Sequence, residues 1–174
     1  MPTALTHALA GLALGEVLAP GPMPAAYHGL TAALGLLPDL DAVGFRLGIP
    51  YGSRFGHRGF SHSLLCAAVV ALVAAAALAA PLASPWWWLG GAFFVVVAGH
   101  GALDALTDGG MGVAFFSPLD DRRYFFPWRT IRVSPIGLAA FSRWGLRALL
   151  SEVAWVWLPL AVLVLAAEWL RGLR

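Results

Sequence analysis

The chain has 174 residues, of which 60% are hydrophobic and only 11% are charged, and its mean hydropathy is +0.78. A soluble domain normally carries about 25% charged residues, so this composition excludes an ordinary soluble protein and predicts one domain, residues 1–174, with a lipid-facing surface. The formal net charge of +2 is too small to favour nucleic-acid binding. The single cysteine, Cys66, lies in an apolar run, which excludes an internal disulfide and a cysteine-based zinc site.

Two apolar segments, residues 4–19 and 25–37, open the chain. They contain histidine and glutamate, and no arginine or lysine precedes them, so we expect retained membrane segments rather than a cleaved signal peptide. Gly11 and Gly15 are four residues apart and predict a face on which another helix packs closely. We interpret His28, which has no polar partner nearby in the sequence, as structural.

Three further apolar runs, residues 63–80, 86–103 and 153–167, come near or reach the length of about 18 residues that is typical of a membrane helix. Ser84 and Pro85 predict the start of the middle one, with the serine as its N-cap and the proline as its first helical residue. The fold class predicted is therefore all-α: a multi-pass integral membrane helical bundle with about five membrane segments.

Residues 134–150 predict a different kind of helix, amphipathic and interfacial. Arg143 and Arg147 are four residues apart and share a face, while leucine and phenylalanine supply an apolar side. Residues 109–132, rich in glycine, proline, aspartate and arginine, predict a loop.

Arginine placement predicts the orientation in the membrane. Nine of the eleven arginines lie in two connections, residues 38–62 and 108–152, and only Arg171 and Arg174 lie elsewhere. The positive-inside rule places both connections in the cytoplasm, so five crossings put the N-terminus inside and the C-terminus outside. Two re-entrant first segments would also leave these connections inside. We expect a bacterial or archaeal cytoplasmic membrane protein.

The polar residues converge on one end of this bundle. His100 and Asp104 share a helical face, Asp108 follows one turn later, and the "LLPDLD" and "HRGFSHS" motifs border the same membrane face. The residues predicted to meet near the cytoplasmic face are His7, Asp39, Asp41, His57, His62, His100, Asp104 and Asp108.

A set of histidines and carboxylates is the ligand set of a divalent metal centre, and ionisable residues inside a membrane are usually paired or functional. We predict ligands among His7, Asp39, His57, His62, His100 and Asp104, holding one or two ions, with zinc favoured and manganese or another metal open. Two simpler interpretations stay open. Asp39 and Asp41 are also typical turn or cap residues, and His100 with Asp104 could form a buried hydrogen-bonded pair.

The ordered motifs "LTHALAGLALG", "LPDLD", "HRGFSHS", "GHGALDALTDGG" and "FSPLDDRRYFFPW" resemble the YdjM-like family of inner-membrane metal-dependent hydrolases, from Thr6 to Trp128. The resemblance implies a multi-pass protein with a hydrolytic metal site. More distantly, the order is similar to that of zinc-dependent phospholipase C, which implies that the ligands are His7, Asp39, His62, His100 and Asp104. This chain lacks the further downstream histidine and glutamate of those enzymes, which argues against a complete three-zinc cluster.

The expected activity is hydrolysis of a phosphate ester of a lipid or another membrane-proximal substrate by metal-activated water. Arginine forks suit phosphate, so we expect Arg58, Arg122, Arg123 and Tyr124 to contact substrate, and Asp41, Arg58 and Asp108 to take part in catalysis as base, phosphate-orienting or supporting groups. Catalysis by a serine, Ser61 or Ser63, is less favoured, since Ser61 is equally plausible as an N-cap.

Two non-catalytic alternatives remain: a membrane protein that binds or transports metal, and a structural or lipid-binding scaffold whose histidines and aspartates only join helices. A transporter would place ligands near the bilayer midplane, whereas these residues gather at one face. Membrane lipids and a lipid or phosphate-ester substrate are the expected partners.

Overall fold

The computed structural model describes residues 1–135 and 141–173, and within these ranges the regular elements are all helical. Their order is α1 (Ala4–Leu18), α2 (Ala25–Leu36), the 3₁₀ helix η1 (Leu37–Leu47), the 3₁₀ turn η2 (Phe60–His62), α3 (Leu64–Leu78), α4 (Trp86–Ala105), α5 (Arg143–Glu152), the π-helical turn η4 (Val153–Trp157) and α6 (Leu158–Gly172). Two isolated bridges, Thr107 with Ile131 and Val113 with Tyr124, are the only β pairing in the described ranges. The predicted all-α class is confirmed.

Helices α1 and α2 form a tight hairpin because small residues line their contact. A Cβ atom at Gly11 would lie 2.3 Å from the carbonyl oxygen of Thr31, and one at Gly35 would lie 2.5 Å from the carbonyl oxygen of His7. Gly15 faces Thr31 in the same way, so the predicted small-residue face is confirmed. This close approach sets the backbone of His7 directly against the end of α2.

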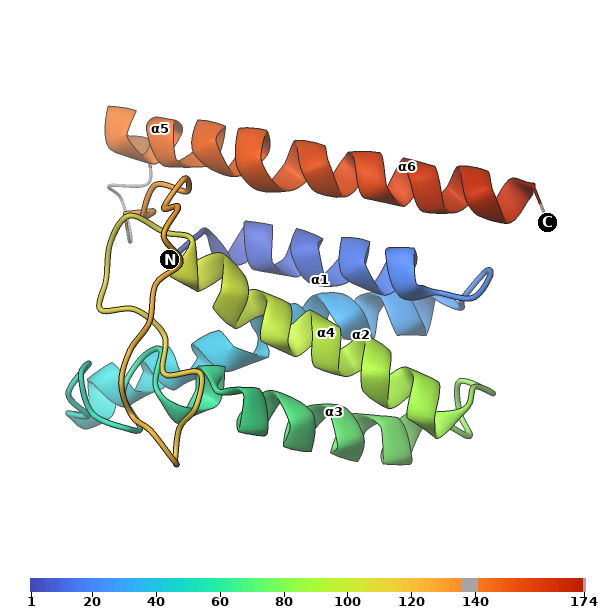
Figure 1. The fold of residues 1–174 in the computed structure, drawn as a ribbon, viewed down its shortest axis with the longest axis horizontal. Coiled ribbons are helices and arrows are strands. Elements are labelled where there is room, and N and C mark those ends of the chain that lie inside the picture. The colour runs from blue at the N-terminus through green and yellow to red at the C-terminus, as the bar shows by residue number, and fades with distance from the viewer. Residues whose placement is uncertain (136–140, 174) are drawn as a thin grey trace.

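Helices α3 and α4 form the second hairpin and pack on the first (Figure 1). Their interface is apolar and includes Ala71 and Ala75 from α3 with Leu89 and Phe93 from α4. Ser63 caps α3 by accepting a hydrogen bond from the amide of Cys66 at 3.1 Å. The N-cap position of α4 is taken by Pro85, not by Ser84 as predicted from the sequence. The reason is that the Ser84 hydroxyl donates backwards, to the carbonyl of Leu82.

Among the described residues, two helices are long and apolar enough to cross a membrane: α4, and the continuous helix Arg143–Gly172 that joins α5, η4 and α6. Helices α1 and α3 are apolar but have 15 residues each, and α2 has 12. At a rise of about 1.5 Å per residue, such helices are shorter than the roughly 30 Å hydrocarbon layer. The structure therefore supports two crossings by length and composition, where the sequence predicted about five.

The predicted interfacial helix, residues 134–150, is not a separate element. Residues 136–140 lie outside the described residues, and α5 runs through η4 into α6 without a break. The π-helical turn comes directly before Pro159, which has no N–H for the carbonyl of Trp155. A widened turn at this point accommodates the missing hydrogen bond and lets the helix continue.

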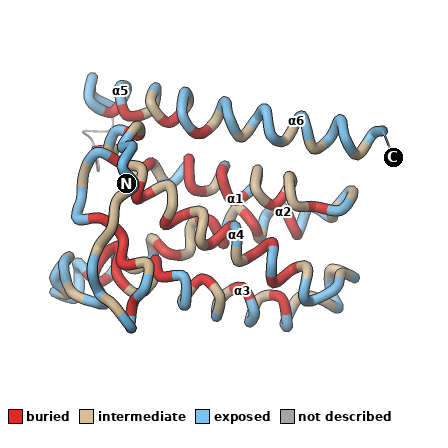
Figure 2. Tube along the Cα trace, viewed as in Figure 1, coloured by how far each residue is buried: buried red, intermediate tan, exposed pale blue. Residues whose placement is uncertain are grey.

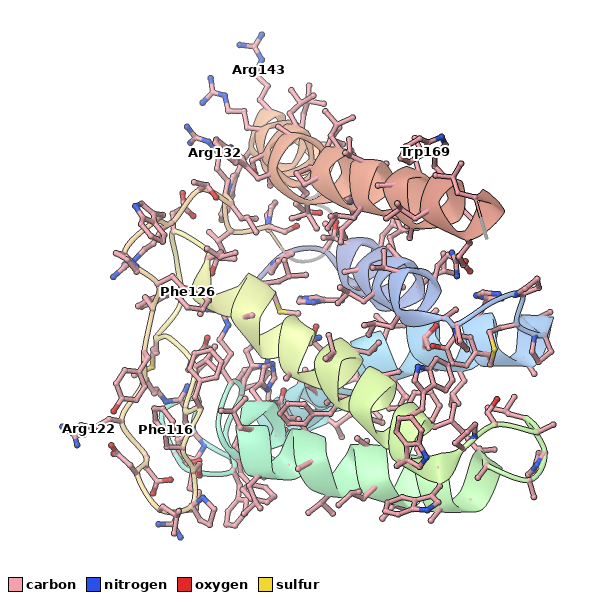
Figure 3. All side chains as sticks on the ribbon, turned by 45° about the vertical axis from the view of Figure 1, so that its right-hand side comes forward. Phe116, Arg122, Phe126, Arg132, Arg143 and Trp169 are labelled. Atoms are coloured by element: carbon pink, nitrogen blue, oxygen red, sulfur yellow. The ribbon has the colours of Figure 1, made fainter. Side chains whose placement is uncertain are left out.

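The connections that carry the polar motifs gather at one end of the molecule, where η1, η2, the chain between α4 and α5, and the N-terminus lie together (Figure 1). The predicted loop at residues 109–132 is confirmed as a loop. Figure 2 shows buried residues concentrated along α1 to α4 and near this end, whereas α6 is mostly exposed. Arg122, Arg132 and Arg143 project from this end and Trp169 lies toward the other (Figure 3).

Candidate metal centre

The site begins where α2 changes into η1. Pro38 is the second residue of η1 and cannot donate the α-helical hydrogen bond to Leu34, so the chain tightens into a 3₁₀ helix. This places Asp39 and Asp41 beside the last turns of α4. The sequence analysis singled out both residues but could not predict that a 3₁₀ helix carries them.

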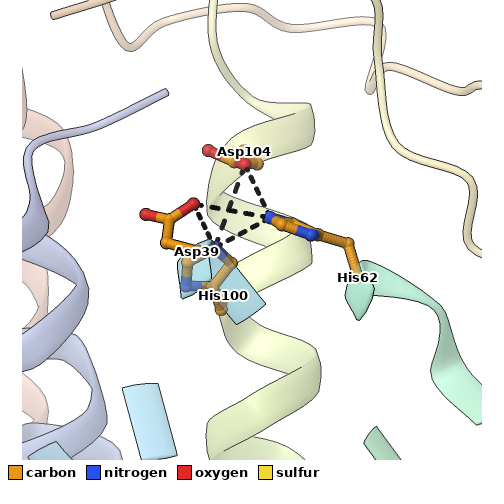
Figure 4. Close-up of side chains that lie close together, drawn as sticks. All are labelled: Asp39, His62, His100 and Asp104. Atoms are coloured by element: carbon orange, nitrogen blue, oxygen red, sulfur yellow. Dashed lines mark hydrogen bonds and ion pairs between the residues drawn. The ribbon is translucent and has the colours of Figure 1, made fainter. Parts of the chain in front are cut away.

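Four side chains from three segments form the centre of the site: Asp39 from η1, His62 from η2, and His100 and Asp104 from α4. One potential ligand atom of each lies within 4.8 Å of those of the other three. Figure 4 shows the two imidazoles and two carboxylates facing one another. The Nε2 atoms of His62 and His100 are 3.0 Å apart, and the Oδ2 atom of Asp104 is 3.3 Å from Nε2 of His62. We call these four residues the central cluster.

The central cluster is buried, yet several of its polar atoms make no hydrogen bond. Both carboxylate oxygens of Asp39 and the Oδ2 atom of Asp104 have no hydrogen-bond partner. Three members are buried, and the side chain of Asp39 is 13% exposed. Because buried polar atoms are nearly always paired, a group of this kind suits a cation that bonds to all of them.

The two histidines are oriented by groups behind them. Nδ1 of His100 lies 2.7 Å from the carbonyl oxygen of Gly35, so this nitrogen carries the proton and Nε2 is left to bind. Nδ1 of His62 lies 3.2 Å from the Oδ2 atom of Asp41 and 2.9 Å from the hydroxyl of Ser61. Both rings therefore present Nε2 to the central cluster, as metal-binding histidines do.

Asp41 joins a second, overlapping group with His57 and His62, whose potential ligand atoms also lie within 4.8 Å of one another. Its Oδ1 atom is 2.6 Å from Nδ1 of His57, and its Oδ2 atom accepts a hydrogen bond from the hydroxyl of Ser61 at 2.5 Å. Since His62 points Nδ1 at Asp41 and Nε2 at the central cluster, Asp41 supports a ligand of that cluster from behind.

The carboxylates and His62 carry shifted pKa values. Burial alone raises the pKa of Asp39, but the nearby imidazoles of His100 and His62 outweigh it and hold this pKa well below its ordinary value. Burial acts in the same direction on Asp41, and His57 and His62 hold its pKa low. Burial lowers the pKa of His62, but contacts with Asp104, Asp39 and Asp41 outweigh it and raise the pKa to about 10. The carboxylates of Asp39 and Asp41 are therefore anionic at neutral pH.

His7 stands at the edge of the central cluster. Its Nε2 atom is 3.6 Å from the Oδ1 atom of Asp104, and its ring stacks on His100 with centroids 3.6 Å apart. His7 is 1% exposed, and neither ring nitrogen makes a hydrogen bond. Asp104 therefore offers one oxygen to the cluster and the other to His7.

Arg58 is completely buried and faces Asp104. Its Nε atom lies 3.0 Å from Oδ2 of Asp104, and Nη2 donates to Oδ1 at 3.2 Å. The other N–H groups donate to the hydroxyl of Thr107 and the carbonyl of Gly109. Its φ of +62° lies in the left-handed region, which costs a side-chain-bearing residue on the order of 1 kcal/mol. The guanidinium, expected to contact phosphate, is occupied by Asp104.

The other predicted site residues lie around the cluster rather than in it. Asp108 is exposed and accepts a hydrogen bond from the amide of Val133, because α4 ends at Ala105 and the expected further turn does not form. Arg122 is exposed and pairs with Asp120, to which the hydroxyl of Tyr124 also donates. Arg123 donates to the backbone carbonyls of residues 51, 53 and 57 and so fixes the loop that carries His57.

The sequence interpretation missed Glu152. This carboxylate is fully buried and accepts hydrogen bonds from the amide and hydroxyl of Thr3 and from the hydroxyl of Thr6. Trp157 also donates to Thr6, at 2.8 Å. These contacts join the start of the C-terminal helix to the first turn of α1, which carries His7. The sequence feature that could have identified Glu152 is its position directly before an apolar run.

Two helices long and apolar enough to cross a membrane, together with a buried group of histidines and aspartates, are the features expected of a membrane protein with a candidate metal centre. The chain belongs to the YdjM inner membrane protein family, whose model matches residues 1–172. It is also 38% identical over 172 residues to inner membrane protein YbcI of Escherichia coli (strain K12), covering 98% of this chain and 99% of the relative. No solved structure matches the chain. The family predicted from the sequence motifs is confirmed.

Proposed function

We propose that this protein is a membrane-bound, metal-dependent hydrolase acting on a phosphate ester of a lipid or another membrane-proximal substrate. The observation that carries the proposal is the central cluster, in which two imidazole Nε2 atoms and two carboxylates meet in a buried space. Mixed nitrogen and oxygen ligands favour zinc and are also compatible with manganese.

The residues present would hold one ion through Asp39, His62, His100 and Asp104. A second ion has two candidate positions: beside His7, which shares Asp104, and beside His57, which shares Asp41. A bound divalent ion supplies Lewis-acid polarisation of water and of a phosphoryl oxygen.

The chain's own residues supply the remaining parts. Asp41, anionic and linked to His57 and Ser61, is the proposed proton acceptor beside the cluster. Asp108 is exposed and engaged with the backbone of Val133, so the role of base rests on Asp41. Arg58 balances the charge of Asp104, while Arg122, whose side chain is 81% exposed, is the loop arginine best placed to meet a substrate phosphate.

We further propose that the site lies near the cytoplasmic face. The end of the molecule that holds the central cluster also carries the exposed Arg122, Arg132 and Arg143 (Figure 3), and the positive-inside rule favours the cytoplasm for such an end. Helix α4 and the helix Arg143–Gly172 would cross the bilayer, and the shorter α3 would lead the chain through it from the site end to the start of α4. Helices α1 and α2 would form a re-entrant pair.

The main alternative is a scaffold in which these residues only hold helices together. The ion pairs of Asp104 with Arg58 and His62 favour that alternative. The ring nitrogens of His7 and the carboxylate oxygens of Asp39, none of which makes a hydrogen bond, argue against it, because a purely structural network satisfies its buried polar atoms. A metal-binding or transport protein without catalysis shares the cluster and differs only in lacking turnover.

Metal content of the detergent-purified protein tests the proposal. We expect one or two equivalents of a transition metal in the wild type, strong loss in His100→Ala, and no loss in His28→Ala, whose histidine lies away from the cluster beside Glu16. The metal-loaded wild type should then hydrolyse phosphate esters presented in lipid vesicles, and His100→Ala should not. A wild type that binds no metal after reconstitution would favour the scaffold alternative. Bound metal without turnover would favour the metal-binding or transport protein.

A further inference from the structure

The outer side of η1 is apolar and uncovered. Leu40 is 64% exposed and Val43 is 55% exposed, although both lie within a few residues of Asp39 and Asp41. A 3₁₀ helix has three residues per turn, so Leu40, Val43 and Arg46 form one row along it. Arg46 is exposed as well. The row is thus two large apolar side chains followed by a cation.

The opposite side of η1 is fixed to the site. Asp39 and Asp41 face the histidines, and the ring of Phe45 lies 5.7 Å from that of His57 and 5.9 Å from that of Tyr51, centroid to centroid. Because these contacts set the rotation of η1, the exposed row cannot turn inward to escape water. Something other than the described part of the chain must therefore cover Leu40 and Val43, or they remain in contact with solvent.

We propose that the row Leu40, Val43 and Arg46 is a membrane-interface anchor that lies in the headgroup layer of the same bilayer that α4 crosses. The two apolar side chains enter the boundary between headgroups and acyl chains, and Arg46 extends to lipid phosphates. An apolar row bordered by arginine is the pattern of interfacial helices, and the arginine charge complements anionic headgroups.

This inference rests on the proposed function for its consequence about substrate. Asp39 is the only partly exposed member of the central cluster, and it lies on the anchored helix, so the opening of the site lies at headgroup depth. The substrate class that fits is the phosphate-bearing headgroup of a membrane lipid, reaching the site without leaving the bilayer.

Spin-label accessibility in nanodiscs containing anionic lipid tests the anchor. Cys66 is the only cysteine, so single nitroxide labels can be placed in a Cys66→Ala background at Leu40→Cys and Val43→Cys. Val69→Cys, on the exposed side of α3, gives the value for lipid contact, and Arg132→Cys, at an exposed arginine with no proposed role in binding, gives the value for water contact. For each label we measure the collision rate with oxygen, which concentrates in the bilayer, and the collision rate with a water-soluble nickel chelate.

We expect the ratio of oxygen to nickel collisions at Leu40 and Val43 to approach that at Val69 and to exceed that at Arg132 clearly. A ratio equal to that at Arg132 overturns the anchor, as does dipolar coupling between labels of neighbouring molecules, which would mean that a second copy covers the row. Metal content of the same samples keeps the two proposals separate. Water-exposed labels with bound metal defeat only the anchor, and buried labels without metal defeat only the hydrolase.

Discussion

The two helices of membrane-spanning length have opposite surroundings. In its most apolar stretch α4 is 56% buried by the rest of the protein, whereas the helix Arg143–Gly172 is only 17% buried, although it is the more apolar of the two. Lipid and protein interior are equally dry, so an apolar run alone does not distinguish them. The polar residues do: His100 and Asp104 lie in the buried helix, and the exposed helix is polar mainly toward its ends.

The exposed helix packs on α1 through Val156 and makes polar contacts to α1 and its flanking residues on either side of that point. Glu152 accepts hydrogen bonds from Thr3 and Thr6, and Arg171 pairs with Glu16 at 2.5 Å and donates to the carbonyl of Ala19. Between these points α6 and α1 leave an apolar groove of about 380 Å³, lined by leucine, alanine, valine and one tryptophan. We infer that α1 to α4 can keep the site while the last helix moves, and substitutions can test that separation.

The largest effect is expected at the buried pair in α1 to α4. Asp104→Ala removes a proposed ligand and leaves Arg58 as a buried charge without its partner, which typically costs about 3–5 kcal/mol. Metal binding and thermal stability in detergent should fall together. Asp108→Ala, at the exposed aspartate one turn further along the chain, is the control and should change neither by much. Equal effects of the two substitutions would show that the buried pair is not special.

A smaller loss is expected at the helix joint. Glu152→Ala removes the acceptor for Thr3 and Thr6 and should lower the free energy of unfolding by about 1–3 kcal/mol. If the last helix is held separately, hydrogen exchange in α5 and α6 rises while bound metal is unchanged. Glu168→Ala, at an exposed glutamate of the same helix, is the control. Loss of metal in Glu152→Ala would show that the joint positions His7, and the proposed independence of the two regions would then be wrong.

Arg58→Lys tests whether the shape of the guanidinium matters in addition to its positive charge. Lysine keeps the positive charge but cannot form the two-point contact with Asp104, so the carboxylate loses its fixed direction. Groups that orient metal ligands typically contribute about 10–100-fold to affinity, and we expect a loss of that size in a zinc titration, with the fold retained. Arg54→Lys, in a surface pair with Asp121, should leave affinity unchanged. An unchanged affinity in Arg58→Lys would return this residue to the role of substrate contact.

The sequence predicted the cluster better than its surroundings. Helical spacing correctly joined His100 to Asp104, and the motifs brought Asp39 and His62 to them. Asp108 was misplaced because helical spacing does not show that α4 ends at Ala105. Arg58 was assigned to substrate because a left-handed backbone turn, which directs its guanidinium inward, has no signature in an arginine. Contacts between distant segments, such as Glu152 with Thr3, are invisible to local patterns.

The predicted number of membrane segments is supported only in part, since two helices have membrane-spanning length and α1, α2 and α3 are shorter. Apolar composition correctly identified α1, α2 and α3 as helices, but their lengths of 12 to 15 residues are set by Pro20, Pro24, Pro38 and the turn after α3. A hydropathy pattern does not show these helix ends, because alanine and leucine occur on both sides of them. The pattern also does not distinguish an apolar face that contacts lipid from one that contacts protein, so five apolar runs were interpreted as five crossings.

The last effect expected is a pH dependence centred on His62 and Asp41. The pKa of His62 is raised from 6.5 to about 10, so below pH 6.5 its proton stabilises the metal-free protein fully, and this stabilisation is lost as the pH rises toward 10. A metal ion must displace that proton. The apparent affinity for zinc should therefore rise by about tenfold per pH unit between pH 7 and 9, with one proton released on binding. Calorimetry in buffers of different ionisation enthalpy measures that proton. Asp41→Asn weakens the hold on the proton and should flatten the slope, while a slope unchanged in this variant would assign the proton to another group.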